Sequence, residues 1–442
     1  MNCYDRHYLK IALPAALEGL FMILLASTDL ILVGALGSLS VAAVSIFLQP
    51  RLILLCFSRS LASAVTLAAC NHAGSGDRER SADLLKKSLV IGALLMGVLH
   101  VLFFYFLEDI FLLMGASADY LPLAMEYGPM ALLAVYFTSL TLILQAVLLG
   151  YGDTSSIMKT NISGNLLNAC LSFVLIRGLG PVPAFGVAGA AFGTAAGTLF
   201  SLLYSYYLLE RKGFFHGGRW MPDRAYFKKV GPLFASVLSE QGSERIGMVL
   251  FSRMAAGLGT VPFAVHSICM NICDVYYDFI MGFGKAGMVT AGQAVGRGSM
   301  ADWHHYSRTG LLWCLILSTA ACGITLAFAH PIFVFYSPDP SLLPLASVIM
   351  VFIAFVSYPE ALALWGAGIL RGSGQTAQVA AYSFLSITFL RPLMTAFFIY
   401  VLDMGLIGTW CALFIDQVIR ASCAAFLVNR LSAKRGFLPD AG

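Results

Sequence analysis

The sequence predicts an all-α membrane protein, with twelve transmembrane helices in two pseudo-symmetric six-helix bundles. Of its 442 residues, 59% are hydrophobic and 11% are charged, and the mean hydropathy is +0.82. Soluble domains carry about 25% charged residues, so this composition excludes a cytosolic enzyme, a nucleic-acid binder and a disulfide-stapled secreted domain. The apolar runs are continuous and lack the alternation of a membrane β-barrel. A repeat between the two halves of the chain, described below, predicts the pseudo-symmetry.

Glycines, prolines and charged residues divide the apolar sequence into segments long enough to span a membrane. A spanning helix needs about 20 residues, and several of these segments are longer, which suggests tilted helices. The twelve predicted spans are residues 11–36, 39–70, 88–108, 120–149, 155–177, 186–209, 230–256, 261–293, 309–335, 343–370, 378–402 and 406–428.

Most of the 27 lysines and arginines fall in every second predicted loop and at the two ends of the chain, while the opposite loops carry acids such as Glu108 and Asp109. By the positive-inside rule, both termini face the cytoplasm of a multi-pass protein of the inner or plasma membrane. The longest polar stretch predicts three parts, an N-lobe (residues 1–210, spans 1–6), a cytoplasmic linker (211–229) and a C-lobe (230–442, spans 7–12). Phe214, Phe215 and Trp220 lie among basic residues of the linker, a pattern typical of a segment at the membrane surface.

The two halves repeat each other at a nearly constant offset. A shift of 222 residues aligns Leu36-Gly37-Ser38 with Leu258-Gly259-Thr260, and it places Ala69 on Ala291 and Gly150 on Gly372. Each half has six predicted spans, so the halves share one topology and are related by an axis along the membrane normal. This architecture favours a transporter with its site between the halves.

Ionisable side chains are costly inside a membrane and are therefore candidates for function. Asp29 lies deep in the first span, where a proton or a cation can neutralise it. Ser27, Thr28 and Asn168 offer oxygen ligands to a small hard cation. We predict ion coupling at Asp29 and Asn168. The alternative is a carboxylate that only accepts hydrogen bonds from neighbouring hydroxyls.

Two acids in the seventh span, Glu240 and Glu244, are one helical turn apart. Such stacked acids suit the binding of protons or of cationic compounds, so both are predicted ion-coupling residues. The alternative is that they pair with Arg245 and Arg253 nearby.

The eighth span carries Asp274 and Asp278 on one stripe, with Tyr277 beside them. Acids next to aromatic rings can bind organic cations, and these three residues are predicted to contact substrate. An internal pair with Lys285 is the alternative. Asp416 and Arg420, one turn apart in the last span, are predicted to form a structural pair.

Two further ionisable residues complete the predicted substrate site. Glu360 lies within the tenth span. Arg51 shares a face of the second span with Arg59, and there it either lines the cavity, which would admit anionic substrates, or neutralises acids of neighbouring helices.

The sequence contains no phosphate-binding loop, nucleophile elbow or HExxH-like metal spacing. We therefore expect no enzymatic activity, no metal site and no cofactor. Transport is driven by an ion gradient, with H⁺ or Na⁺ as the coupling ion, or is passive.

Taken together, the motifs of the chain resemble the multidrug and toxic compound extrusion (MATE) family of the polysaccharide and lipid flippase superfamily. The resemblance covers nearly the whole chain, in order and in both halves. It rests on Asp29-Leu-Ile-Leu-Val-Gly34-Ala-Leu-Gly37, Gln145-Ala-Val-Leu-Leu-Gly150-Tyr-Gly152-Asp153-Thr154, Asn168, Gly186-Val-Ala-Gly189, Glu240-Gln241 with Arg245 and Gly247, Gly282-Phe-Gly284, Gly292-Gln293-Ala-Val-Gly296 and Arg371-Gly-Ser-Gly374.

The resemblance implies two six-helix lobes and the efflux of small organic, often cationic, compounds in exchange for H⁺ or Na⁺. It implies that Asp29 is the coupling acid of the N-lobe and that Glu240 or Glu244 serves the C-lobe. Family members place an Asn and an Asp four residues apart in the fifth span, where this chain has Asn168 and Ser172. The tenth span offers Glu360 in place of an Asp.

The leading hypothesis is thus a cation-coupled multidrug antiporter that works as a monomer in membrane lipid. The first alternative is a flippase for a lipid-linked or anionic amphiphilic substrate, motivated by Arg51, Arg59, Arg253 and Lys285. A membrane enzyme or a channel is the second alternative, and the two-lobe repeat argues against it.

Overall fold

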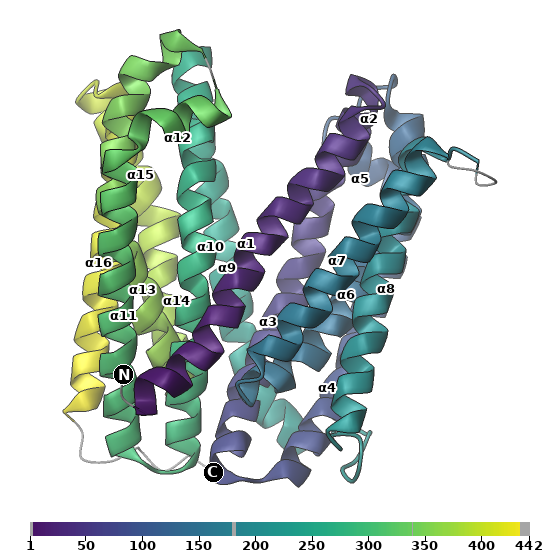
Figure 1. Cartoon of the computed structure of the whole chain (residues 1–442), viewed down its shortest axis with the longest axis vertical. Coiled ribbons are helices and arrows are strands. Elements are labelled where there is room, and N and C mark those ends of the chain that lie inside the picture. The colour runs from purple at the N-terminus through teal and green to yellow at the C-terminus, as the bar shows by residue number, and fades with distance from the viewer. Residues whose placement is uncertain (1–2, 179–182, 338, 434–442) are drawn as a thin grey trace. The chain divides into compact units, whose positions relative to one another are not determined.

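The computed structural model describes residues 3–178, 183–337 and 339–433, and of these it leaves undescribed the side chains of residues 24–31 and 38. Every regular element in this part of the chain is a helix (Figure 1). The predicted all-α fold class is therefore confirmed.

The long helices coincide with the predicted spans, and short helices break or follow some of them. The elements are α1 (Cys3–Gly34), α2 (Ser38–Ser45), α3 (Leu48–Ser75), α4 (Arg78–Tyr105), α5 (Leu107–Leu113), α6 (Leu121–Gly150), α7 (Thr154–Arg177), α8 (Gly186–Arg211), α9 (Arg224–Ala256), α10 (Thr260–Gly296), α11 (Met300–Ala327), α12 (Ala329–Tyr336), the 3₁₀ turn η1 (Pro340–Leu342), α13 (Leu343–Gly372), α14 (Thr376–Ser383), the π-helical segment η2 (Phe384–Leu390), α15 (Arg391–Ala396), the π-helical segment η3 (Phe397–Val401) and α16 (Gly405–Ser432).

Eight helical segments in the described residues are long and apolar enough to cross a membrane. They are Leu39–Ser75, Arg78–Tyr105, Leu121–Gly150, Gly186–Arg211, Met300–Ala327, Pro340–Gly372, Thr376–Val401 and Gly405–Ser432. The other four predicted spans correspond to α1, α7, α9 and α10, which are 32, 24, 33 and 37 residues long. These lengths also exceed the requirement for spanning, and the protein is a multi-pass membrane protein.

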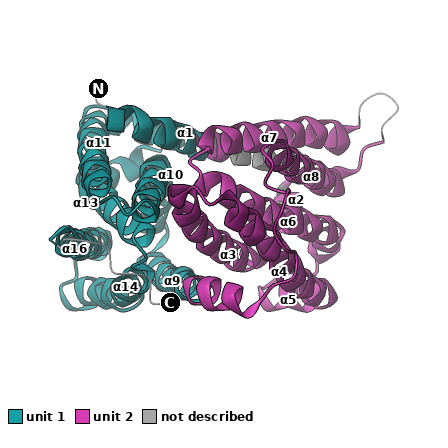
Figure 2. Ribbon diagram, turned by 90° about the horizontal axis from the view of Figure 1, so that it is seen from below, with its two compact units in different colours: residues 1–19, 235–442 teal, residues 20–234 magenta. Residues whose placement is uncertain are grey.

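The chain folds into two compact units (Figure 2). One comprises residues 1–19 and 235–442, and the other comprises residues 20–234. Residues 1–19, which the sequence analysis assigned to the N-lobe, are thus grouped with the second half of the chain. Close packing on α10 accounts for this, since the Tyr8 hydroxyl donates to the carbonyl of Phe283 at 2.7 Å and a Cβ added to Gly282 would lie 2.3 Å from the backbone nitrogen of Ala16.

Each unit repeats the local structure of the other at the predicted offset. Gly37 precedes α2 with φ 106° and ψ 170°, and Gly259 precedes α10 with φ 106° and ψ 173°. This left-handed region favours glycine. The close helix contacts repeat as well: a Cβ on Gly150 would lie 2.6 Å from the Cβ of Ala69, and one on Gly372 would lie 3.0 Å from the Cβ of Ala291.

The predicted linker packs on the beginning of α4, within residues 20–234. The Nζ of Lys86 donates to the carbonyl of Gly217 at 2.5 Å and lies 5.3 Å from the centre of the Trp220 ring. Lys87 forms ion pairs of 2.7 Å with both Asp83 and Asp223. The linker is therefore held by specific polar contacts with the protein.

Each unit also has its own apolar interior. In residues 20–234, side chains of α3, α4, α6 and the linker form one buried cluster, which includes Leu61, Leu85, Val147 and Phe214. In the other unit, Phe251, Cys269, Ile349 and Trp410 belong to a cluster formed by α9, α10, α13 and α16. Because lipid supplies no hydrophobic drive between helices, close packing of this kind stabilises each bundle.

Candidate functional site

Charged and hydroxyl side chains gather inside the unit of residues 1–19 and 235–442, on α9, α10, α13, α16 and the broken helix between Thr376 and Val401. Most of these helices span the membrane, so each buried charge needs a partner, a proton or water. The contacts distinguish charges that are paired from those that are not.

Glu240 of α9 is paired with Arg371, in the last turn of α13. The Nη2 of Arg371 lies 2.5 Å from Oε1 of Glu240, and the Glu240 side chain is 8% exposed. The alternative partners considered from the sequence, Arg245 and Arg253, do not form this ion pair. Arg371 thus supplies a counter-charge that already occupies one carboxylate oxygen of Glu240.

Glu244, one turn further along α9, is half-buried and is an electrostatic neighbour of Tyr277 of α10. Glu244 and Arg420 both act electrostatically on Tyr277, and Arg245 acts on Asp274. The predicted substrate residues Asp274, Tyr277 and Asp278 are all on α10, with Asp274 exposed and the other two half-buried. The carboxylates of Asp274 and Asp278 are therefore accessible to a cation.

Among the buried acids whose side chains the structure describes, Glu360 of α13 has a carboxylate oxygen without a hydrogen-bond partner. Its side chain is 5% exposed, it follows Pro359 in the middle of the helix, and its Oε2 has no hydrogen-bond partner in the described part of the chain. Its charged neighbours are Asp274, Arg420 and Arg391. An ionised carboxylate in this position is costly unless a proton, a cation or water satisfies it.

Asp416 of α16 pairs with Arg391, which corrects the predicted pair between Asp416 and Arg420. The Nε of Arg391 lies 3.0 Å from Oδ2 of Asp416, the Nη2 contacts the same oxygen, and Ser386 donates to Oδ1. Both charged side chains are buried, at 4% and 0% exposure. The Nε of Arg420 is also buried but has no hydrogen-bond partner among the described residues.

The π-helical segments explain why sequence spacing gave the wrong partner. The N–H of Arg391 bonds to the carbonyl of Ser386, five residues back, at the end of η2. A π turn inserts one extra residue and changes the face that later side chains present. Regular helical spacing on α16 predicted the pair one turn apart, whereas the irregular neighbouring helix brings Arg391 to Asp416.

In residues 20–234, Asn168 is buried at the interface of α7 and α8. Its Oδ1 accepts a hydrogen bond of 2.9 Å from Ser172, and a Cβ on Gly197 of α8 would lie 2.7 Å from its Cβ. The amide is thus tightly packed, and it is 5% exposed. Its role in ion coupling stays a prediction.

The structure gives less detail on the remaining predicted site residues. Asp29 belongs to α1, but its side chain lies outside the described residues, as do those of Ser27 and Thr28. Arg51 is exposed on α3. No group of three or more His, Cys, Asp or Glu side chains in the described residues could hold a metal ion.

Sequence reasoning missed three participants in this polar interior. Arg371 comes directly after the predicted tenth span, residues 343–370, and so falls outside the ionisable residues predicted within spans. Arg391 and Tyr382 lie within the predicted span of residues 378–402, where the sequence pattern assigns them no role, and the buried hydroxyl of Tyr382 lacks a partner in the described chain. Arg371 is a basic residue within one turn of the end of a span. Such a residue can pair with a buried acid of another span, and this signal could have identified it.

Comparisons with known proteins agree on the family. The MatE family model matches residues 14–174 and 232–397. A relative from Rhizobium meliloti called "Probable multidrug resistance protein NorM" is 25% identical over 97% of this chain and 93% of its own length. "Multidrug resistance protein MdtK" from Pectobacterium atrosepticum is 23% identical over 95% and 93%.

Solved structures share the fold. A crystal structure of MATE in the bent conformation superimposes with a TM-score of 0.88 over 98% of both chains at 20% identity, and one in the straight conformation gives 0.89 over 97% of this chain and 96% of the other, also at 20% identity. The family model matches one long segment in each half and together most of the sequence, so the chain belongs to the MatE family.

Proposed function

We propose that this protein is a secondary active transporter that exports small organic compounds, mainly cations, in exchange for H⁺ or Na⁺ by alternating access. Members of the family are transporters and not enzymes, and relatives along nearly the full length are named multidrug resistance proteins. These names give no support to the flippase alternative.

The buried carboxyl group of Glu360 is the observation that carries the proposal. A side chain that is 5% exposed, with an unpartnered Oε2 in the described structure, is suited to take up a proton or a cation and release it when water reaches it. Glu240 is occupied by Arg371 and Asp416 by Arg391. Among these three acids, Glu360 is the one available for exchange.

The acids of α10 supply the substrate side of the proposal. Asp274 is the exposed member and an electrostatic neighbour of Glu360, so a bound cation and a proton on Glu360 would compete through charge. Tyr277 beside them offers a ring face to an organic cation. Asp29 and Asn168 are proposed to serve the same exchange in the first half of the chain.

We place both termini in the cytoplasm and expect one copy of the chain, surrounded by lipid, to be sufficient for transport. The loop charges support this orientation. Cysteine labelling from either side of intact cells would measure it directly.

Vesicles that contain the purified protein and a fluorescent organic cation test the function. We expect efflux driven by a pH or Na⁺ gradient, applied one at a time, and an approximately tenfold slower rate for Glu360→Gln. Glu108→Gln, which neutralises an exposed acid of α5, is the matched control and should transport at the wild-type rate. Wild-type rates for Glu360→Gln under both gradients would refute the role of Glu360, and absence of gradient-driven efflux in the wild type would refute the function.

A further inference from the structure

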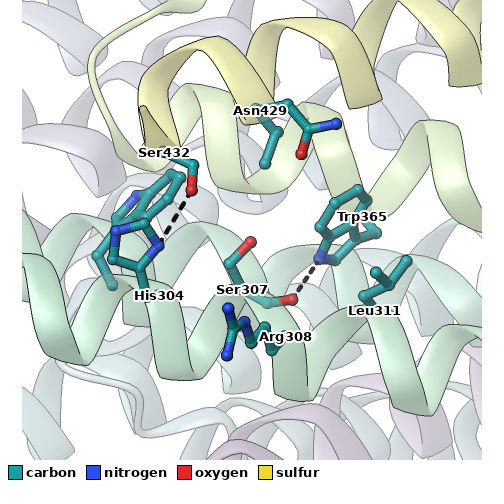
Figure 3. Close-up of a pocket in the computed structure, with 9 residues that line it drawn as sticks. His304, Ser307, Arg308, Leu311, Trp365, Asn429 and Ser432 are labelled. Atoms are coloured by element: carbon teal, nitrogen blue, oxygen red, sulfur yellow. Dashed lines mark hydrogen bonds between the residues drawn. The ribbon is translucent and has the colours of Figure 1, made fainter. Parts of the chain in front are cut away.

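A cavity that none of these acids lines lies between the beginning of α11 and the end of α16, with Trp365 of α13 also in its wall. It has a volume of about 230 Å³ and is lined by residues such as Trp303, His304, Arg308, Trp365 and Asn429. Figure 3 shows His304, Ser307 and Leu311 on α11 facing Asn429 and Ser432 on α16. Pockets for drug-sized ligands measure about 300–1,000 Å³, so this cavity suits a smaller group.

The walls of the cavity are fixed by hydrogen bonds. The indole N–H of Trp365 donates to the carbonyl of Ser307 at 2.9 Å, and that of Trp303 donates to the hydroxyl of Ser373 at 2.8 Å. His304 Nδ1 and Ser432 Oγ lie 3.2 Å apart and join α11 to α16 (Figure 3). A cavity with such fixed walls is preorganised for a ligand.

The side-chain hydrogen-bond donors that line this cavity favour an anionic ligand. Within the described part of the chain, the side chains of Ser307, Arg308 and Asn429 have no hydrogen-bond or ion-pair partner, and no carboxylate lines the cavity. The guanidinium of Arg308 is exposed and can donate two parallel hydrogen bonds to a phosphate. A hydroxyl and an amide beside it add neutral donors.

The composition of α11 indicates that the cavity lies close to the depth of lipid headgroups. The first part of α11, Met300 to Gly310, is polar and about 16 Å long, and the apolar run from Leu311 to Ala327 covers about 25 Å. Arg308 is therefore one turn from the apolar run. Since Leu311 and Val428 also line the cavity, an acyl chain can continue from it into the hydrocarbon.

We propose that this cavity binds the phosphate of an anionic phospholipid, with Arg308, Ser307 and Asn429 as donors and the two tryptophans as walls. Basic pockets between transmembrane helices on the cytoplasmic side are suited to such headgroups. The lipid would join α11 to α16 at one membrane face. Free inorganic phosphate shares the recognition chemistry but lacks the acyl chains that the apolar edge of the cavity can receive.

Native mass spectrometry of the full chain, taken from mixtures of phosphatidylglycerol and phosphatidylcholine, measures this binding. We expect the protein to retain bound phosphatidylglycerol in preference to phosphatidylcholine. Arg308→Gln should reduce that preference about tenfold, because it removes a charge-assisted hydrogen-bond donor from the cavity. Arg430→Gln is the matched control, since Arg430 is an exposed basic residue near the same end of α16 that does not line the cavity. It should change the preference less than twofold.

Two additions keep the test decisive. Asn429→Leu, at an exposed helix position, should obstruct the cavity and reduce lipid retention even if Arg308→Gln does not fold, and thermal melting reports folding for each variant. Equal losses for Arg308→Gln and Arg430→Gln would mean general attraction to a basic surface and would overturn the site. So would equal retention of both lipids by the wild type, or displacement of phosphatidylglycerol by millimolar inorganic phosphate.

Discussion

The buried ion pair between Arg391 and Asp416 gives the sharpest prediction for stability. Replacing Arg391 with Met leaves Asp416, which is 0% exposed, as an unpaired charge. Loss of one partner of a buried ion pair costs about 3–5 kcal/mol. We therefore expect the free energy of unfolding of Arg391→Met to fall by about that amount, despite the gain in apolar character.

The measurement is unfolding in mixed detergent micelles by titration with a denaturing detergent, followed by circular dichroism. A double variant, Arg391→Met with Asp416→Asn, removes both charges and should recover most of the loss, since replacing a whole buried pair is often close to neutral. Arg420→Met is the matched control. Because Arg420 has no hydrogen bond to Asp416 in the described structure, this variant should cost clearly less than Arg391→Met.

Two results would contradict the reasoning. If Arg391→Met costs less than about 1 kcal/mol, the pair is not buried or not formed in the membrane protein. If Arg420→Met is the more damaging variant, Asp416 pairs with the residue one turn away after all, and the π-helical segment does not set the partner.

Two further predictions concern helix contact and pH. Gly372→Ala should destabilise the protein by about 1–3 kcal/mol, because the added Cβ would lie 2.3 Å from the carbonyl oxygen of Met288. Burial raises the pKa of Asp153, but the hydrogen bond and charge of Lys212 outweigh this and hold that pKa below its ordinary value of 3.8. The pair thus stabilises the folded state above about pH 4, and this contribution is lost as the pH falls through the lowered pKa. Lys212→Met should therefore cost less than about 1 kcal/mol at pH 7, since the lysine is 39% exposed, and nothing in strong acid.

Unfolding curves of each variant check both predictions. Gly97→Ala has open space around the added Cβ and should be neutral or stabilising by up to about 1 kcal/mol, because alanine favours helix. A neutral Gly372→Ala would mean that α10 and α13 are further apart. For Lys212→Met, a stability loss that persists unchanged below pH 3 would rule out the charge on Asp153 as its origin.

The sequence alone determined the helical class, the membrane location and the internal repeat, because these depend on local composition and spacing. Runs of apolar residues must be helical in lipid, since no water satisfies the backbone there. Glycines at a constant offset kept the same positions in both halves, as Gly37 and Gly259 show with their matching backbone angles. The sequence also indicated that the candidate site consists of acids buried in spans, because ionisable side chains are costly inside a membrane.

Only the tertiary structure decided which charge pairs with which. Arg371 reaches Glu240 across 131 residues and Arg391 reaches Asp416 across 25, and both pairs join different helices. Sequence spacing describes neighbours on one helix, whereas a partner on another helix depends on rotation, on kinks and on the extra residue of a π turn. For the same reason, the Glu360 oxygen that has no partner among the described residues could not be recognised until the partners of the other acids were known.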